Sequence, residues 1–396
     1  MKERIKIVIV IPSLASGGAE KSLVNLLNSM DYTTYSVDLV LLSKTGLFLN
    51  LIPKEVTLIN FPNKYTIFSQ SMVKSVLGFI AKAQFGLAYN RVLFTLKNKT
   101  IKNTNRAEQA AWKHHRVFCP KLDNHYDVAI GYLEKTSIYF AVDCIQAKTK
   151  IGFIRTDYSK LGLEMNFDKK YFQKLEYLCA NGDSSLQVLA TLFPEYKNKL
   201  RMIMNVVSTK LIRDLAMEKS TLDSSKTNIV SVGRLDSVKG FDMAIEACAI
   251  IKKSHPNINW HIIGEGIERA NLQAKIDALD LKKEFFLLGE KQNPYPYMNA
   301  ATVYAQTSLH EGRSSTINEA KILNKAIVAT NFDSIFEQIQ NEVNGVIVKK
   351  NPPAIAKAIL ELINDQQKSQ RFSIALSTEK LGTEEEIQKF YELLKA

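Results

Sequence analysis

Cysteine is scarce in this chain. Its 396 residues include four cysteines, and no two of them form a Cys-x-x-Cys pair. Thiols scattered in this way provide neither the ligand set of a zinc site nor a disulfide framework. We therefore expect reduced cysteines, no bound metal and a cytoplasmic protein.

Long apolar runs are absent as well. The apolar stretch near the start ends at Pro12, and no later run approaches the roughly 18 apolar residues that a membrane helix needs. A secretory signal sequence also needs a longer apolar segment than this one. The sequence predicts neither a signal sequence nor a membrane span.

Acidic residues are few in the first half of the chain. Residues 1–205 contain 28 Lys and Arg against 16 Asp and Glu, whereas the rest of the chain has 24 of each. Between Lys64 and Lys121 there are eleven basic residues and a single acid, Glu108. Such a positive field attracts nucleic acid, anionic lipid headgroups or an acidic ligand. No nucleic-acid recognition motif accompanies it, so we expect no nucleic-acid partner.

The length and the apolar content of the chain fit two globular domains. Apolar strands alternate with segments of helical periodicity, which predicts the α/β class with parallel sheets. We expect a first domain at 1–207, a linker at 208–226, a second domain at 227–378 and a C-terminal helix within 379–396. A basic insertion at about 65–121 predicts one or two amphipathic helices. Membrane-surface attachment and a solvated helical insertion explain it equally well.

The stretch from Thr307 to Ala320 joins a predicted strand to a predicted helix. Its hydroxyl and carboxylate side chains are Glu311, Ser314, Ser315, Thr316 and Glu319. Small hydroxyl residues suit a helix N-terminus, where free N–H groups and the helix dipole favour an anion such as phosphate. The two carboxylates can accept hydrogen bonds from ligand hydroxyls. Phosphate and hydroxyls together indicate a nucleotide sugar.

Two cations follow the first predicted strand of the second half. Arg234 can bind two phosphate oxygens at once, and Lys239 can act as a point charge on the same diphosphate. Farther along, Gly264 and Gly266 allow a backbone to approach closely at the end of a strand. These residues extend the predicted site for an anionic ligand.

Two loops at strand ends in the first half are further candidates. Gly17 and Gly18 separate the first strand from its helix without the G-x-G-x-x-G dinucleotide pattern, so they mark an ordinary turn or a cup for phosphate or sugar. Arg155 and Asp157 follow another strand, at the edge where α/β sheets bind ligands. Substrate contact and a structural ion pair explain these two residues equally well.

One ordered set of motifs resembles the family 4 retaining glycosyltransferases, of the bacterial type that builds capsule or exopolysaccharide. The set consists of Arg234, Lys239, Gly264-x-Gly266, Leu288-Gly289 and Glu311-x7-Glu319. The resemblance is strong over about 228–362 and continues more weakly through Gly17-Gly18-Ala19-Glu20. It implies a GT-B fold, with two Rossmann-like domains whose parallel sheets face an interdomain cleft. The donor nucleotide would bind in the second domain and the acceptor in the first, and the last helix would cross back to the first domain.

The resemblance also implies roles for individual residues. Arg234 and Lys239 would bind the donor diphosphate and stabilise the leaving charge, while Glu311 would bind the donor sugar at the reacting centre without acting as a nucleophile. Glu319 would hold the ribose hydroxyls. The rest of the donor-nucleotide site would be Gly264, Gly266, Gly289, Lys291, Ser315 and Thr316. The other sugar and acceptor contacts would be Gly17, Gly18, Arg155, Asp157, Gly312, Arg313 and Ser314.

The implied function is transfer of a hexose or N-acetylhexosamine from a UDP-sugar to a lipid-linked saccharide in bacterial surface polysaccharide biosynthesis. The reaction would retain the anomeric configuration and need no metal or other cofactor. The protein would be peripheral on the inner face of the plasma membrane, held to anionic lipid by its basic first domain. Two alternatives stay open: a GT-B sugar-nucleotide epimerase, and a non-catalytic partner subunit of an active glycosyltransferase.

One position departs from the family's pattern. Similar proteins often carry His where Arg155 stands, and arginine cannot accept a proton. Arg155 would then contact a phosphate of the lipid diphosphate acceptor, or the chain would be a poorly active member of the family. The same departure motivates the alternative of a non-catalytic partner. His310, beside Glu311, is best explained as a surface or capping histidine.

Overall fold

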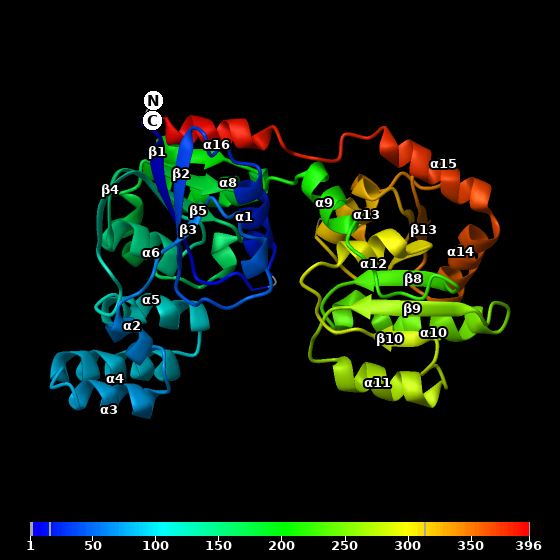
Figure 1. Cartoon of the computed structure of the whole chain (residues 1–396), viewed down its shortest axis with the longest axis horizontal. Helices are drawn as coiled ribbons and strands as arrows, with labels where there is room; N and C mark the ends of the chain where they lie inside the picture. The colour runs from blue at the N-terminus through cyan, green and yellow to red at the C-terminus, as the bar shows by residue number, and fades with distance from the viewer. Residues whose placement is uncertain (1–2, 16, 313, 396) are drawn as a thin grey trace. The chain divides into compact units, whose positions relative to one another are not determined.

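Figure 1 shows the computed structural model of the chain, which describes residues 3–15, 17–312 and 314–395. The chain divides into two compact units, one formed by Met1–Val207 with Thr383–Ala396 and the other by Ser208–Gly382. Each unit has its own parallel sheet covered by helices. Within the described ranges, no helix is both long enough and apolar enough to cross a bilayer.

The first unit is built on a seven-stranded sheet with the order β3-β2-β1-β4-β5-β6-β7. Its strands are β1 (Ile5–Ile11), β2 (Tyr35–Leu41), β3 (Thr57–Leu58), β4 (Leu122–Gly131), β5 (Ile145–Ile154), β6 (Tyr177–Ala180) and β7 (Leu200–Met202). Its helices are α1 (Gly18–Asn28), α2 (Asn63–Phe68), α3 (Met72–Ile80), α4 (Phe85–Thr100), α5 (Thr104–His115), α6 (Thr136–Asp143), α7 (Met165–Phe172), α8 (Asp183–Leu192) and α16 (Glu386–Leu394). All of the recorded strand pairings are parallel, as expected for the α/β class.

Strand β1 shows why this sheet is buried on both faces. Ile7 and Ile9 pack into one apolar cluster, and Val8 and Val10 pack into another on the opposite face. Successive side chains of a strand point to opposite faces, so a nearly continuous apolar strand needs cover on both sides. Helices α1 and α16 contribute to the first cluster, and α5 to α8 contribute to the second.

The C-terminal helix α16 belongs to the core of the first unit. Phe390 is fully buried in the cluster that contains α1. The ring of Tyr391 stacks on Tyr35 with centroids 4.7 Å apart, and its hydroxyl accepts a hydrogen bond from the backbone N–H of Asp31 at 2.7 Å. The last segment of the chain therefore completes the hydrophobic cover of the first sheet.

The basic insertion contains four helices, α2 to α5, rather than the one or two that the sequence predicts (Figure 1). A tight turn separates α3 from α4, because Ala83 adopts a left-handed conformation with φ of 54°. The backbone N–H of Gln84 then bonds to the carbonyl of Phe79 at 2.9 Å, which closes the helix end. A second break precedes α5, where Asn103 caps the helix by accepting from the N–H of Arg106. Neither break carries a glycine or proline signal.

The second unit is built on a six-stranded sheet with the order β10-β9-β8-β11-β12-β13. Its strands are β8 (Thr227–Val232), β9 (Ile258–Ile263), β10 (Phe285–Leu287), β11 (Val303–Gln306), β12 (Ala326–Thr330) and β13 (Val346–Val348). Its helices are α9 (Thr209–Ala216), α10 (Phe241–Lys252), α11 (Arg269–Ala278), α12 (Tyr295–Ala300), α13 (Ser315–Ile322), α14 (Pro352–Asn364) and α15 (Gln366–Ser377). Helices α10, α11, α14 and α15 share one apolar cluster with the strands.

The segment 208–226, expected to be a linker, instead starts with a helix of the second unit. Ser208 caps α9 by accepting from the N–H of Leu211, and Ile212 is fully buried. Arg213 donates from Nε to the carbonyl of Ile322 on α13 at 3.3 Å. The charged residues that suggested a linker are the solvent-facing side of an amphipathic helix.

Candidate functional site

The second sheet has a topological switch point between its central strands β8 and β11. Both strands are parallel neighbours, yet the chain leaves β8 toward β9 and later returns to place β11 on the other side. In open α/β sheets the loops that follow the two strands at such a point diverge and leave a crevice for a ligand. Here these loops are 233–240 and 307–314, and they carry the predicted donor-site residues Arg234, Lys239 and Glu311.

The two loops meet through a cluster around the carboxylate of Glu311. Its Oε1 lies 2.5 Å from Nζ of Lys239, so the two loops are joined by an ion pair. The same oxygen accepts from Nε2 of Gln306 at 3.0 Å and from the hydroxyl of Ser308 at 2.8 Å. The side chains of the ion pair are only 18% and 15% exposed. A carboxylate with three donors is held in one orientation.

Gln306 positions this cluster, and our sequence analysis missed it. Its buried side-chain carbonyl accepts from the hydroxyls of Tyr304 at 2.9 Å and Thr316 at 3.1 Å, while its amide nitrogen donates to Glu311 and Ser308. Every hydrogen-bonding position of the amide is used. The available signal was a polar residue at the end of an apolar strand, directly before a loop with functional residues.

Arg234 is placed differently from Lys239. Its side chain is 84% exposed, and Nη2 lies 3.3 Å from a carboxylate oxygen of Asp236. An exposed guanidinium with one weak partner among the described residues is accessible to an anion. The predicted pair of cations therefore comprises one ordered group and one accessible group.

The glycines near β9 have a structural reason as well as the predicted functional one. A Cβ on Gly264, whose φ is 151°, would lie 1.9 Å from the carbonyl oxygen of Gly233. A Cβ on Gly266 would lie 2.3 Å from the carbonyl oxygen of Leu235. Both glycines thus allow the loop after β9 to pack directly against the loop that carries Arg234. Gly289 pairs with Gly264 in an isolated bridge.

The N-terminus of α13 is ordered from two sides. The Ser314 hydroxyl caps the helix by accepting from the N–H of Ile317 at 3.4 Å, and the Ser314 N–H and carbonyl both bond to the side chain of Gln338 at 2.8 Å. Ser315 is exposed, Thr316 is half-buried, and Glu319 is buried one turn into the helix. This arrangement leaves the first turn of α13 accessible to an anion.

Of three other predicted donor-site residues, the structure describes Gly312, which is in one of these loops, and Lys291, which follows β10. Gly312 is exposed, and its carbonyl accepts from the hydroxyl of Ser334. Lys291 is half-buried, with its ammonium 5.9 Å from the ring centroid of Tyr297. Arg313 lies outside the described residues. Contacts of these residues with a nucleotide sugar stay predictions.

The first sheet has its own switch point, between β1 and β4. Gly17 precedes α1 as its N-cap, and a Cβ on Gly18 would meet no atom within 4 Å. On the other side of the switch point, the loop after β4 contributes Glu134 to a cavity of about 320 Å³. The other lining residues are Pro12, Leu42, Phe94, Asn98, Glu108, His115, Leu133, Lys135 and Thr136. This cavity lies at the strand ends where an α/β unit binds its ligand.

Arg155 is largely buried by groups of its own unit. Its Nη1 donates to Oδ1 of Asn205 at 2.5 Å, and the guanidinium lies over the ring of Tyr132 at 4.0 Å from the centroid. Its backbone N–H donates to the carboxylate of Glu134 at 3.1 Å. Only 9% of the residue is exposed, and its Nε has no hydrogen-bond partner among the described residues. The side chain joins the ends of neighbouring elements, and its contact with a phosphate stays a prediction.

Asp157 forms a local turn. Its carboxylate caps the short helix η2 (Tyr158–Lys160) by accepting from the N–H of Ser159 at 3.1 Å and from its hydroxyl at 2.6 Å. These hydrogen bonds hold the pKa of Asp157 below its usual value. Asp157 therefore has a structural role as a helix cap. It also forms an ion pair with Lys160 at 3.4 Å.

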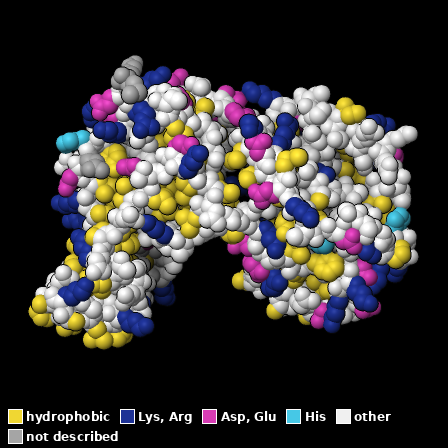
Figure 2. All heavy atoms as spheres, in the orientation of Figure 1, with side chains coloured by type: hydrophobic (Ala, Val, Ile, Leu, Met, Phe, Trp, Pro, Cys, Tyr) yellow, Lys and Arg dark blue, Asp and Glu magenta, His cyan; other side chains and the backbone are white. Residues whose placement is uncertain are grey.

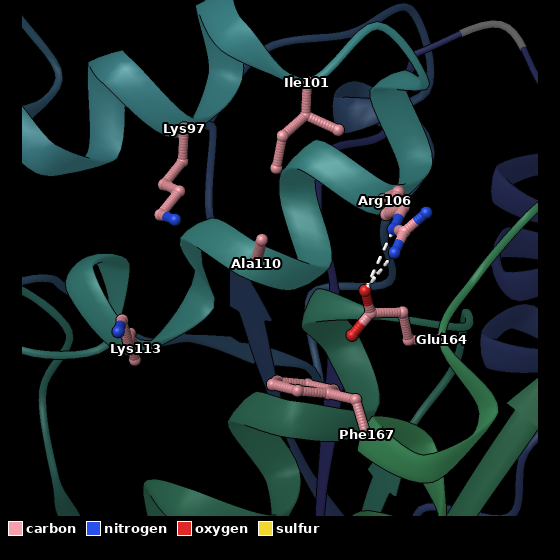
Figure 3. Close-up of a pocket in the computed structure, with 7 residues that line it drawn as sticks. All are labelled: Lys97, Ile101, Arg106, Ala110, Lys113, Glu164 and Phe167. Carbon is pink, nitrogen blue, oxygen red and sulfur yellow. Dashed lines mark hydrogen bonds and ion pairs between the residues drawn. The ribbon is translucent and has the colours of Figure 1, made fainter.

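A basic pocket of about 500 Å³ lies among α4, α5 and α7 (Figure 3). Its lining residues are Lys97, Ile101, Arg106, Ala110, Lys113, Glu164 and Phe167. Arg106 forms an ion pair with Glu164, the pocket's single acid, whereas the ammonium groups of Lys97 and Lys113 have no protein partner among the residues that the structure describes. The positive charge that the sequence places in this insertion is thus accessible on its surface. In the described parts of both units, no three His, Cys, Asp or Glu side chains gather in a way that could hold a metal.

Residues 212–376, which contain all of the cluster around Glu311, match the family model described as glycosyl transferases group 1. This part of the chain is a glycosyl transferases group 1 domain. The family predicted from the ordered motifs is confirmed for this segment.

The chain is also similar to two enzymes of Campylobacter jejuni. It is 31% identical over 163 residues to the N-acetylgalactosamine-N,N'-diacetylbacillosaminyl-diphospho-undecaprenol 4-alpha-N-acetylgalactosaminyltransferase, a match that covers 41% of the chain and 43% of that protein. It is 23% identical to the GalNAc-alpha-(1->4)-GalNAc-alpha-(1->3)-diNAcBac-PP-undecaprenol alpha-1,4-N-acetyl-D-galactosaminyltransferase, over 91% of the chain and 90% of that protein. Two further relatives match over part of their length: the chain spans 41% of one from Methanocaldococcus jannaschii and 55% of one from Haemophilus influenzae.

Solved structures resemble the chain over almost its whole length. The crystal structure of HepE from Anabaena in complex with UDP superimposes with a TM-score of 0.60 at 17% identity, covering 99% of this chain and all of that one. This likeness shows the fold. The prediction of a GT-B protein with two parallel-sheet α/β units is confirmed.

Proposed function

We propose that the protein is a retaining glycosyltransferase. It transfers a hexose or N-acetylhexosamine from a UDP-sugar to a lipid-linked saccharide in bacterial surface polysaccharide biosynthesis. The observation that carries the proposal is the Lys239–Glu311 cluster, which joins the two loops of the switch point within the glycosyl transferases group 1 domain. A sugar diphosphate matches these groups, because it offers an anion to cations and hydroxyls to carboxylates.

In this proposal each donor-site group has a separate task. Arg234 and Lys239 bind the diphosphate and stabilise the charge that develops on it when the glycosidic bond breaks. Glu311 orients the transferred sugar through its hydroxyls, and Glu319 holds the ribose. Support for a UDP donor comes from HepE, whose structure contains UDP. We propose no metal and no other cofactor for the reaction.

The acceptor is proposed to bind to the first unit. The cavity beside Glu134 lies at the ends of β1 and β4, where a saccharide can enter. Support for a lipid-linked acceptor comes from the two Campylobacter relatives, whose names specify saccharides on diphospho-undecaprenol or PP-undecaprenol. Such an acceptor resides in a membrane, so we propose a peripheral protein on the inner face of the plasma membrane, attracted by anionic lipid.

Calorimetric titration with UDP tests the donor site. The full chain is expected to bind UDP, and Glu319→Ala is expected to weaken binding at least tenfold, because a pair of ribose hydrogen bonds to a charged group is lost. Glu337→Ala removes an exposed glutamate of the same unit and serves as the matched control. Absence of UDP affinity in the unaltered protein would contradict the enzyme proposal and favour a non-catalytic partner.

A donor screen then identifies the reaction. UDP-hexoses and UDP-N-acetylhexosamines are incubated with the protein, with and without an undecaprenyl-diphosphate-linked saccharide, and free UDP is measured. A transferase releases UDP faster when the acceptor is present. Conversion of one UDP-sugar into its epimer without acceptor would show the alternative reaction instead.

A further inference from the structure

The hairpin formed by α3 and α4 exposes an unusual number of large apolar side chains. Six of them are more than two-fifths exposed: Val73, Leu77, Ile80, Phe85, Tyr89 and Leu96. In Figure 2 apolar side chains gather at the free end of the segment labelled α3 and α4 in Figure 1, with Lys and Arg side chains beside them. A contiguous apolar patch on a protein surface marks an interaction site.

Helix α3 is apolar on two opposite faces. Phe79 is fully buried against the core of the first unit, as is Ser75 one turn before it. Val73, Leu77 and Ile80 lie at helical spacing on the other face and are 65%, 60% and 45% exposed. An apolar helix face is stable when it lies in an apolar medium, and the face with Val73, Leu77 and Ile80 is exposed instead.

The charge around this patch is of one sign. The sequence contains no Asp or Glu between residues 56 and 107, while Lys74, Lys82, Lys99 and Lys102 are exposed within this segment. Arg91, in contrast, is structural: it is 9% exposed and donates from Nε to the carbonyl of Phe68 at 3.1 Å. Apolar side chains surrounded by lysines complement a surface that has an apolar interior and anionic groups at its boundary.

We infer that the α3–α4 hairpin inserts its tip into an anionic lipid bilayer. Leu77 and Phe85 enter the acyl region, Tyr89 lies at the headgroup level, and the lysines contact lipid phosphates. This inference rests on the proposed function, because a lipid-linked acceptor is presented at a membrane. It adds the element that binds the lipid and the depth to which that element enters.

The insertion is tested with the full chain and vesicles of phosphatidylcholine with or without 50% phosphatidylglycerol. Sedimentation is expected for the unaltered protein with the anionic vesicles. Leu77→Asp combined with Phe85→Asp is expected to weaken this binding at least about tenfold, because two apolar anchors are lost. Met217→Asp with Ile267→Asp, at residues of the second unit that are 80% and 88% exposed, is the matched control and is expected to bind like the unaltered protein.

The lysines are tested separately. Lys74→Gln with Lys82→Gln is expected to weaken binding to the anionic vesicles by about fivefold per lysine at low salt. Lys349→Gln with Lys350→Gln removes two exposed lysines of the second unit and is expected to have no effect. Equal loss from both pairs would show a response to net charge alone and would overturn the placement of lipid on the hairpin.

A fluorescent reporter separates insertion from surface adsorption. The chain's two tryptophans, Trp112 and Trp260, are buried, so a tryptophan introduced as Phe85→Trp reports on its own surroundings. Its emission is expected to shift to the blue with anionic vesicles, whereas Ile267→Trp is expected to show no shift. Absence of the blue shift at Phe85→Trp would refute insertion of the tip.

Two further measurements decide between outcomes. Light scattering shows whether the hairpin instead binds a second copy of the chain. The inference would be overturned if the protein formed a dimer that Leu77→Asp with Phe85→Asp dissociates and did not sediment with lipid. UDP affinity is measured on the same variants. If Leu77→Asp with Phe85→Asp binds UDP and still sediments with anionic vesicles like the unaltered protein, only the membrane role of the hairpin is refuted. If the unaltered protein does not bind UDP, the donor site is refuted and the lipid result stands.

Discussion

Gln306 offers a sharp test of how the proposed donor site is built, through the substitution Gln306→Met. Methionine keeps the length of the side chain and removes its polar atoms. The hydroxyl of Tyr304, which is fully buried, then loses its acceptor, which costs about 1–3 kcal/mol of unfolding free energy. Glu311 loses one of its three donors and keeps Lys239 and Ser308. The cluster is therefore expected to persist with its carboxylate less well oriented.

The expected consequence is a split between nucleotide binding and transfer. UDP lacks the transferred sugar that Glu311 is proposed to contact, so the UDP affinity of Gln306→Met is expected to stay within about twofold of that of the unaltered protein. The value of kcat/KM for the UDP-sugar is expected to fall roughly 10- to 100-fold, because misplacing a positioning group by about an ångström has effects of that size. Calorimetry measures the first quantity and release of UDP measures the second. Gln273→Met, at an exposed position on α11, is the matched control.

The conservative variant Gln306→Glu adds a readout that a merely structural role would not move. Its carboxyl group would lie about 3 Å from Oε1 of Glu311, and two like charges at this distance raise the apparent pKa of the pair. The protonated form still donates a hydrogen bond to Glu311, whereas the ionised form repels it. Transfer by Gln306→Glu is therefore expected to be lost as the pH rises through this apparent pKa. Parallel pH profiles for Gln306→Glu and the unaltered protein would refute the positioning role.

Three further predictions concern the turn before α4, a buried histidine and the two cations of the proposed donor site. Ala83→Gly is expected to stabilise the protein by about 1 kcal/mol in urea unfolding. Glycine has no Cβ and therefore adopts the left-handed φ of 54° without steric strain. Burial lowers the pKa of His261 to about 4 from an ordinary 6.5. The stability linked to its neutral form is therefore complete above pH 6.5, and about 3 kcal/mol of unfolding free energy is lost as the pH falls toward 4. Urea unfolding at pH 7 and 4.5 should show less acid sensitivity for His261→Gln than for the unaltered protein. Lys239→Met is expected to lower the unfolding free energy by about 1–3 kcal/mol, because Glu311 is left without its cation. Adding Glu311→Gln should restore stability without restoring UDP affinity. Arg234→Met, in contrast, should weaken UDP binding and leave stability unchanged.

The regular elements of the fold could be predicted because their periodicity is strong and local. The predicted strand before Thr307 is β11 (Val303–Gln306), and the helix predicted to follow it is α13 (Ser315–Ile322). The insertion was harder, since its breaks depend on a left-handed alanine and an asparagine cap rather than on glycine or proline. The helix at Thr209–Ala216 was taken for linker because its exposed side is charged. Local composition does not show which side of such a segment is covered by another element.

The site was predictable in its residues and not in their contacts. Lys239 and Glu311 were both expected at the donor site, but their ion pair depends on β8 and β11 becoming neighbours in the sheet, which is a long-range event. Burial was the other missing quantity. Arg155 was a candidate for substrate contact or for a structural ion pair because it follows a strand at the ligand-binding edge of the sheet. The sequence could not show that Asn205, from a distant segment, would bind its guanidinium.

The chain's cations fall into two groups that the structure handles in opposite ways. In the second unit, which has 22 Lys and Arg against 20 Asp and Glu, Lys239 is paired with the carboxylate of Glu311, so a ligand must compete with a fixed partner, whereas Arg234 is exposed beside Asp236. Competition of this kind costs affinity for any anion and favours one whose hydroxyls also satisfy the carboxylates. On the α3–α4 hairpin the lysines have no acidic neighbours in the sequence, and they attract anions without selecting among them. A cation paired with a carboxylate, such as Lys239, thus suits recognition of one donor. The lysines of the hairpin suit attachment to a membrane surface of mixed lipid composition.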